Sequence, residues 1–215
     1  MKESFMAAIF AISMVFYGVS EAASPVCPGS PFVNGPGEDG VGPYDYYDLD
    51  ARKKYLAVVE AHHFTPSVEG LSRGSSGTVA QDLGYTLNSF PNHPRALVSL
   101  LNLVFSRPGS QLGDFSKDPE CFFWRAVAFR PNDHRAKEIY GVFLYKKGRL
   151  QEAREQFAAA EVNGYDAPLF HYNFGLILVE LREWEKAMHH AKKAYASGVS
   201  FPGLRRKLQQ SGKWK

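Results

Sequence analysis

The segment Tyr140–Ala160, YGVFLYKKGRLQEAREQFAAA, returns 34 residues later as Phe174–Ala194, FGLILVELREWEKAMHHAKKA. Small and apolar residues keep their spacing between the two copies: Gly141 recurs as Gly175, Leu144 as Leu178, Ala153 as Ala187 and Ala160 as Ala194. A lone helix does not require such a repeat. The spacing therefore indicates a structural unit that recurs along the chain.

The repeat continues toward the N-terminus. The sequence FPNHPRALVSLLNLVF, which begins at Phe90, matches RPNDHRAKEIYGVFLY, which begins at Arg130, with an offset of 40 residues. The helix expected over 122–130 still follows the 34-residue register: Phe123 aligns with Phe157, and Ala126 with Ala160 and Ala194. The six additional residues are therefore expected between the two helices of the first unit, in an enlarged loop within 106–120.

Prolines and leucines extend the pattern to the C-terminus. Pro94, Pro168 and Pro202 fall at equivalent helix starts, where a missing N–H costs little and the fixed φ suits the first turn. Leu204 and Leu208 align with apolar positions of the preceding first helices. The last residues are therefore expected to form a terminal helix that covers the final unit.

Pairs of antiparallel helices that repeat every 34 residues are typical of tetratricopeptide repeat (TPR) arrays, and this chain resembles that family from about Phe90 to Leu208. The resemblance implies an all-α, TPR-type helical-hairpin solenoid with an irregular N-terminal arm and a C-terminal capping helix. About three TPR-like units would occupy residues 90–199, and the capping helix residues 200–215. Small residues let neighbouring helices approach closely, and larger ones fill the gaps: Tyr140, Phe157 and Phe174.

Residues 1–22 have the pattern of a secretory signal peptide. Lys2 precedes an apolar run over residues 5–19, and Ser20 and Ala22 are small residues suited to cleavage. The run is shorter than the roughly 18 residues of a membrane-spanning helix. The sequence therefore predicts a periplasmic or secreted protein, with an uncleaved anchor as the alternative.

Two segments separate this signal from the repeats. Residues 23–50 are rich in Gly and Pro and are expected to form an extended arm. Residues 51–89 are expected to form a helical segment, with Asp50 as the N-cap of its first helix and Pro66 just beyond that helix.

Cys27 and Cys121 are the only cysteines. Because thiols of an exported protein tend to pair, the sequence predicts a disulfide that ties the arm to the helical body. The alternative is a buried free thiol at Cys121 and an unpaired Cys27.

Little in the sequence indicates catalysis or a cofactor. It contains no G-x-S-x-G, H-E-x-x-H, C-x-x-C or phosphate-binding G-x-x-x-x-G-K pattern. The histidine pairs 62–63 and 189–190 point about 100 degrees apart on a helix and cannot easily face one metal, so we expect surface histidines and no metal site. The formal charge of +3 is too small to indicate nucleic-acid binding. We expect a non-enzymatic protein without cofactors; the alternative is an enzyme whose site is assembled from scattered residues.

By resemblance to TPR arrays, the first helices of the units would line a concave groove that binds a protein or peptide. Aromatic residues there offer contact area at low entropic cost, and the amide of Asn173 could hold an extended backbone. The alternative is that these residues pack against the arm or the final helix. The residues expected on the groove are Arg95, Val98, Asn102, Phe105, Arg135, Glu138, Val142, Tyr145, Leu169, Tyr172, Asn173, Leu176 and Val179.

From Lys186 onward the chain contains lysine and arginine but no carboxylate side chain. Arg205, Arg206 and Lys207 form its densest basic patch. Such one-sided charge could contact an acidic partner, an anionic polysaccharide or an anionic membrane surface; the alternative is a solvated cap. The sequence as a whole predicts an exported scaffold or assembly factor that recognises a partner by shape.

Overall fold

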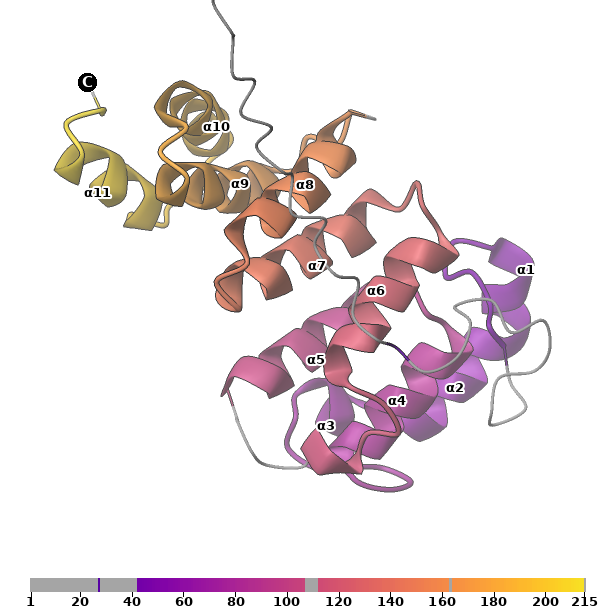
Figure 1. Cartoon of the computed structure of the whole chain (residues 1–215). Helices are drawn as coiled ribbons and strands as arrows, with labels where there is room; N and C mark the ends of the chain where they lie inside the picture. Colours follow the sequence, from indigo (N-terminus) through magenta and orange to yellow (C-terminus); the bar gives the residue numbers. More distant parts are fainter. Residues whose placement is uncertain (1–26, 28–41, 107–111, 163, 215) are drawn as a thin grey trace, which may run out of the picture.

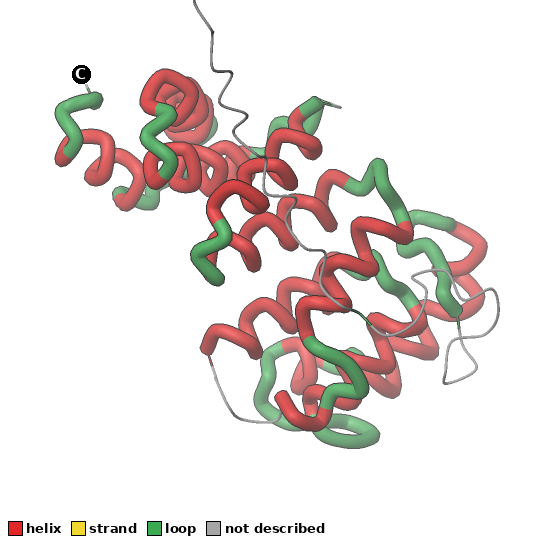
Figure 2. Tube along the Cα trace, in the orientation of Figure 1, coloured by secondary structure: helices red, strands yellow, loops and turns green. Residues whose placement is uncertain are grey.

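The computed structural model describes Cys27 and residues 42–106, 112–162 and 164–214, and every regular element among them is a helix (Figure 2). The expected signal peptide and most of the expected arm lie outside the described residues. The helices are α1 (Leu49–Ala51), the π-helical η1 (Arg52–Leu56), α2 (Ala57–His63), α3 (Pro66–Glu69), α4 (Val79–Ser89), α5 (Pro94–Ser106), the 3-10 helix η2 (Leu112–Asp114), α6 (Pro119–Phe129), α7 (His134–Lys146), α8 (Leu150–Glu161), α9 (Pro168–Glu180), α10 (Trp184–Ala196) and α11 (Gly203–Gln210).

The helices follow one another in a stack from the N-terminal helices to α11, so the predicted all-α solenoid is confirmed (Figure 1). Helix α7 packs closely along α8, and α9 along α10, each pair joined by a short turn. Helix α8 also contacts α9, and α11 contacts both α9 and α10. A continuous apolar core runs from Phe64 to Leu208, and Leu56, Val59 and Phe90 form a second, smaller cluster at the N-terminal end.

Small residues sit where neighbouring helices come closest. A Cβ atom on Gly141 of α7 would lie 2.6 Å from the ring of Phe157 on α8, and one on Gly175 of α9 would lie 2.6 Å from a methyl group of Leu204 on α11. The repeated alanines of the second helices are completely buried: Ala126, Ala153, Ala160, Ala187 and Ala194. The sequence repeat is therefore a repeat of close helix contacts.

The terminal helix covers the last pair as expected. Leu204 and Leu208 are fully buried, while the intervening Arg205 and Arg206 are exposed. Helix α9 begins at Pro168, α5 begins at Pro94, and Pro202 immediately precedes α11. These prolines therefore stand at helix starts, where the sequence placed them.

The unit formed by α5 and α6 is more open than the two that follow. Helix α5 contacts α7 more extensively than it contacts α6, its neighbour along the chain. The connection between them carries η2, and Phe115 packs its ring against that of Phe122 with centroids 5.6 Å apart. In this unit the enlarged loop packs on α6 through Phe115, whereas short turns hold the two helices of each later pair against each other.

The N-terminal segment adds helices to the same stack. Helix α4 packs against both α2 and α5, and it begins with a capping box between Thr78 and Gln81. The expected N-cap at Asp50 was wrong: the Asp48 carboxylate accepts hydrogen bonds from the backbone N–H groups of Asp50 and Ala51. The first helix begins earlier because Asp48 satisfies these free N–H groups two residues sooner.

The last part of the expected arm is fixed to the helical body. Cys27 and Cys121 form a disulfide, as the sequence predicted. The ring of Tyr44 stacks on Tyr55 with centroids 4.2 Å apart, and its backbone N–H donates to the carbonyl of Ser89 at 2.8 Å. No helix among the described residues is long and apolar enough to cross a membrane.

Candidate binding face and neighbouring sites

The residues predicted to line a groove share one side of α7 and α9. Val142, Tyr145, Tyr172 and Leu176 are half-buried, each with part of its surface packed on the core and part open to solvent. Val179 is buried, with 8% of its surface exposed. We call these five residues the first-helix face.

The side chains of α7, α9 and α11 approach one another near Tyr145. Lys207 of α11 donates to Glu180 of α9 at 2.6 Å, and this hydrogen bond raises the pKa of Lys207. Burial, with a smaller contribution from the negative charge of Glu180, raises the pKa of Tyr145. The phenol therefore stays neutral and remains a hydrogen-bond donor beside an ion pair.

At the start of α7, two of the predicted groove residues, Arg135 and Glu138, form an ion pair with each other. Arg135 donates to Glu138 at 2.5 Å, and the hydroxyl of Tyr165 donates to the same carboxylate at 3.0 Å. Glu138 is buried, and these two hydrogen bonds satisfy its carboxylate. This part of the predicted site is an internal network.

Arg95 contacts the N-terminal segment of the chain. Its guanidinium forms two hydrogen bonds with the carboxylate of Glu69, lies 3.3 Å from Glu60 and covers the ring of Phe64. Arg95 therefore packs on the N-terminal helical segment, and not on the arm or the final helix that were the alternatives to a groove. Further along α5, Val98 and Phe105 are half-buried and Asn102 is exposed.

The remaining predicted residues of α9 lie at the edges of this face. Leu169 is 48% exposed, and Asn173 is half-buried, with an amide that makes no hydrogen bond to the described part of the chain. Tyr172 packs edge-on against Phe201, with ring centroids 5.6 Å apart, and its hydroxyl lies close to Gly203. The C-terminal segment therefore borders the first-helix face beside α9.

The basic residues of α11 are partly engaged within the chain. The Arg205 guanidinium lies 4.5 Å from the ring centre of Tyr195 and 5.1 Å from that of Trp214. Lys207 is paired with Glu180, as described above. Of the three predicted basic-patch residues, Arg206 is exposed without a charged partner among the described residues.

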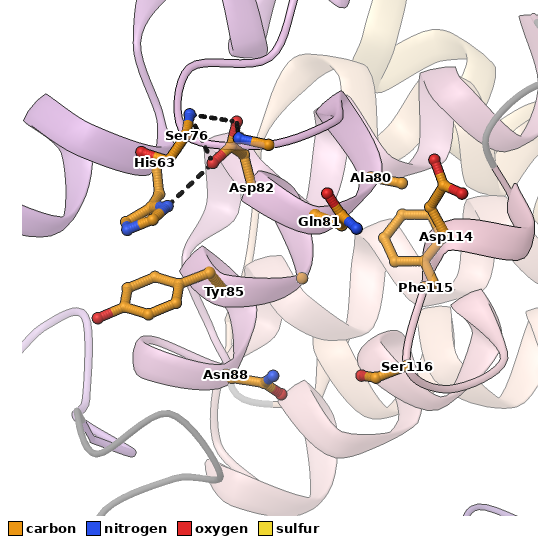
Figure 3. Close-up of a pocket in the computed structure, with 12 residues that line it drawn as sticks. His63, Ser76, Ala80, Gln81, Asp82, Tyr85, Asn88, Asp114, Phe115 and Ser116 are labelled. Atoms are coloured by element: carbon orange, nitrogen blue, oxygen red, sulfur yellow. Dashed lines mark hydrogen bonds and ion pairs between the residues drawn. The ribbon is translucent and has the colours of Figure 1, made fainter.

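A pocket of about 300 Å³ lies beside α4, between the 72–78 loop and the loop after η2 (Figure 3). Asp82, which is 1% exposed, accepts a hydrogen bond from the His63 ring at 2.9 Å and from the backbone N–H groups of Ser75 and Ser76 at 2.6 Å and 3.1 Å. This carboxylate ties the loop and the end of α2 to α4.

This pocket carries a histidine–aspartate pair but lacks an activated nucleophile among the residues that line it. The hydroxyl of Ser76 donates to the carbonyl of His62 at 2.9 Å, so it is directed away from the imidazole. The His63 ring instead stacks on Tyr85, with centroids 3.8 Å apart. The arrangement therefore supports a structural role for Asp82.

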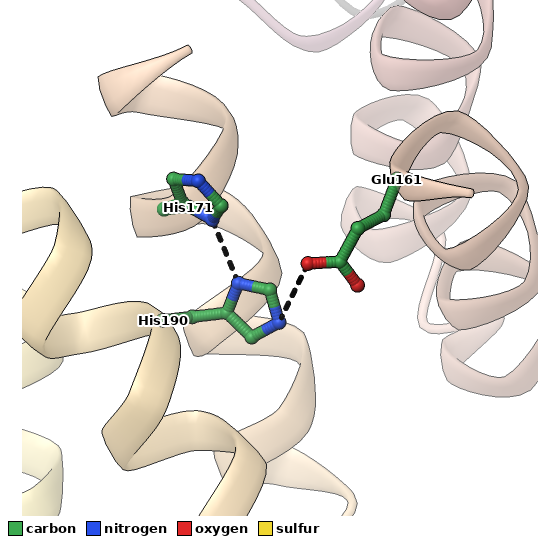
Figure 4. A group of neighbouring side chains, drawn as sticks. All are labelled: Glu161, His171 and His190. Atoms are coloured by element: carbon green, nitrogen blue, oxygen red, sulfur yellow. Dashed lines mark hydrogen bonds and ion pairs between the residues drawn. The ribbon is translucent and has the colours of Figure 1, made fainter. Parts of the chain in front are cut away.

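His190, which we expected on the surface, is buried with 4% of its surface exposed, and His93 and His171 are also buried, with 0% and 2% exposed. His171 of α9 and His190 of α10 approach each other, with their Nδ1 atoms 2.8 Å apart (Figure 4). Glu161, the last residue of α8, lies next to His190. Burial lowers the pKa of His190 to about 3, and the nearby His171 adds to this effect.

Sequence reasoning missed this histidine cluster because it considered only histidines adjacent in the chain. In the 34-residue register His171 corresponds to Lys137 and His190 to Gln156. The cluster is therefore not part of the repeat. A search for histidines on facing positions of the paired helices α9 and α10 would have found it.

The fold and the first-helix face define a helical-hairpin solenoid of the TPR type. The chain is structurally similar to the MamA protein, with a TM-score of 0.50 and 14% identity over 76% of this chain and 84% of that one. PilF of Pseudomonas aeruginosa gives a TM-score of 0.49 and 18% identity over 76% of this chain and 70% of that chain. No family model and no curated protein matches the sequence.

Proposed function

We propose that the protein is a non-enzymatic binding module that recognises a protein or peptide partner through the first-helix face. A TPR-type solenoid presents a row of first helices to a ligand, and partner recognition is the general role of such repeats. The proposal includes a role as an exported scaffold or assembly factor, which the disulfide supports because such bonds persist in oxidising compartments.

The observation that carries the proposal is the set of half-buried aromatic and aliphatic side chains on adjacent first helices. Tyr145 and Tyr172 each have one side packed on the core and the other open to solvent. Such anchored aromatics lose little conformational entropy when they bind a partner. The ion pair of Lys207 and Glu180 adds polar groups at the edge.

A capture experiment with immobilised full-length chain tests this proposal. Tyr145→Ala combined with Asn173→Ala is expected to abolish capture of a defined partner from an envelope extract. The matched control replaces Gln151 and Glu155, two exposed residues of α8, with alanine and is expected to retain capture. Circular dichroism and thermal melting must show that both variants fold. Equal capture by both variants would exclude the first-helix face as the binding site.

The basic end of the chain gives a second candidate, the binding of an anionic polysaccharide or lipid. The exposed side chain of Arg206 beside Arg205 and Lys207 favours it. Their replacement by serine, together, is expected to abolish sedimentation with anionic vesicles and to leave protein capture unchanged. Binding at this surface is expected to weaken as salt rises, because exposed charges are screened.

The proposed lack of enzymatic activity rests on how the polar groups of the His63 pocket are used. Asp82 accepts hydrogen bonds from the backbone and from His63, and the hydroxyl of Ser76 donates to the carbonyl of His62. A screen of the purified chain against ester, peptide and glycoside substrates tests this. Turnover that disappears in His63→Gln would overturn the proposal.

A further inference from the structure

Four polar side chains lie in a row across the junction of α8, α9 and α10. Asp166, in the loop before α9, lies 2.5 Å from Nε2 of His171. Nδ1 of His171 lies 2.8 Å from Nδ1 of His190, and Nε2 of His190 lies 3.7 Å from Oε1 of Glu161. Figure 4 shows the His190 ring between the other histidine and the glutamate.

The first contacts of this row place a free lone pair inside the junction. The Asp166 carboxylate, which is also paired with Lys193 at 2.8 Å, accepts from Nε2 of His171. The two Nδ1 atoms lie 2.8 Å apart, so at least one of them is unprotonated and presents a lone pair to the other.

The last contact of the row is not closed by a hydrogen bond. Nε2 of His190 and Oε1 of Glu161 are 3.7 Å apart, which is too long for one. Glu161 also stands at the C-terminus of α8, where the helix dipole disfavours a negative side chain. A cation between these groups would bridge the gap and balance the carboxylate charge.

We propose that Glu161, His171 and His190 bind one divalent transition-metal ion, with Zn²⁺ as the expected ion. One ligand atom from each of the three side chains can be chosen so that all lie within 4.8 Å of one another. Two imidazoles and a carboxylate form a recurrent zinc ligand set, with a fourth position for water. Imidazole nitrogens favour zinc and related ions over calcium or magnesium.

Only small movements are needed to close the site. Two nitrogens bound to one tetrahedral zinc ion lie about 3.3 Å apart, since each Zn–N bond is about 2.0–2.1 Å. If both Nδ1 atoms bind, neither carries a proton, and the rings must separate by about half an ångström. Glu161 can follow because its side chain is 40% exposed.

Asp166 fits the role of a supporting residue for this site. A metal-binding histidine usually donates its other ring N–H to a carboxylate, which fixes the tautomer and the ring orientation. Asp166 accepts from His171 in this way, and it balances the charge of Lys193 next to the site. The bound ion would connect α8, α9 and α10 and stabilise this end of the solenoid.

Zinc titration of the untagged, chelator-treated full chain tests the proposal. Isothermal titration calorimetry is expected to give one site per chain, and the thermal midpoint is expected to rise with zinc concentration because the ion binds the folded state. Cobalt substitution is expected to give visible d–d absorption. Absence of saturable binding at micromolar zinc would overturn the proposal.

Single variants identify the ligands. His171→Gln and His190→Gln are expected to abolish stoichiometric binding, and Glu161→Gln to weaken it at least tenfold. Asp166→Asn is expected to weaken binding by about 10- to 100-fold, as for other supporting residues. His189→Gln, an exposed neighbour of His190, is the matched control and should bind as the parent does.

The partly exposed Glu161 keeps the test decisive if a histidine variant fails to fold. Unchanged zinc affinity in Glu161→Gln, or loss of binding in His189→Gln alone, would show that zinc binds elsewhere and would overturn the assignment. The measurement does not depend on the partner of the first-helix face, so its result is independent of the proposed function.

Discussion

Gly141 of α7 faces the ring of Phe157 on α8 so closely that a Cβ atom on Gly141 would lie 2.6 Å from Phe157 Cδ2. Phe157 is fully buried and also contacts the rings of Phe170 and Phe174. The ring therefore cannot move away without disturbing α9. Helices α7 and α8 can approach this closely only because Gly141 has no side chain.

Gly141→Ala is therefore expected to destabilise the protein by about 1–2 kcal/mol. Overpacking costs about 1–3 kcal/mol, and the better helix propensity of alanine offsets only part of this. Gly175→Ala is the matched comparison, because its Cβ would meet a methyl group of Leu204 on the terminal helix, which can shift. Urea titration should rank Gly175→Ala as the milder change, and the reverse order would contradict the packing argument.

Reduction of the disulfide is expected to lower the free energy of unfolding by up to about 4–5 kcal/mol. This upper value follows from the chain entropy of a closed loop of this length, since Cys27 and Cys121 are 94 residues apart. Guanidinium titrations of the native chain and of Cys27→Ser/Cys121→Ser measure the difference. Two free thiols in the folded, non-reduced chain would show that the bond does not form.

Leu208→Ala is expected to loosen the terminal helix and to destabilise the last helix pair by about 2 kcal/mol or more, because Leu208 is fully buried. Hydrogen exchange should become faster in α11 and on the side of α9 that α11 covers. Arg206→Ala, on the exposed side of the same helix, is expected to change stability by less than about 0.5 kcal/mol. Equal effects would mean that α11 does not cover the stack in solution.

Asp82→Ala is expected to release the 72–78 loop. Removal of the buried carboxylate leaves the N–H groups of Ser75 and Ser76 and the ring of His63 without their acceptor, which costs about 1–3 kcal/mol or more. Limited proteolysis should cut the variant in this loop before it cuts the parent chain. Asp114→Asn, in the same pocket, is the control and should leave the cleavage pattern unchanged.

Stability at acidic pH is expected to depend on the contacts of α5 with the N-terminal segment. Hydrogen bonding to Arg95 lowers the pKa of Glu69, and hydrogen bonding to His93 lowers that of Glu60. Because both folded-state values lie below the ordinary value of 4.5, the stabilisation is present above pH 4.5 and is lost as the pH falls through the folded-state values. Urea titrations at several pH values should show a weaker acid dependence for Glu69→Gln.

The sequence alone determined the architecture of the repeats. The 34-residue spacing of the alanines follows from their full burial in all three second helices, and that of Gly141 and Gly175 from close contacts with Phe157 of α8 and Leu204 of α11. The same periodicity placed the terminal helix and the enlarged loop. The N-cap of the first helix was assigned wrongly, because Asp48 and Asp50 are equally good capping residues in the sequence.

The tertiary structure decided how the side chains on that framework are used. Arg95 was expected on a binding groove, but the N-terminal helices supply Glu60 and Glu69 to pair with it. Glu161, His171 and His190 are separated along the chain and follow no repeat, yet the stacking of α8, α9 and α10 brings them together. A periodic pattern records contacts that every unit shares, whereas a contact made once depends on which helices meet, and this is settled only when the chain is folded.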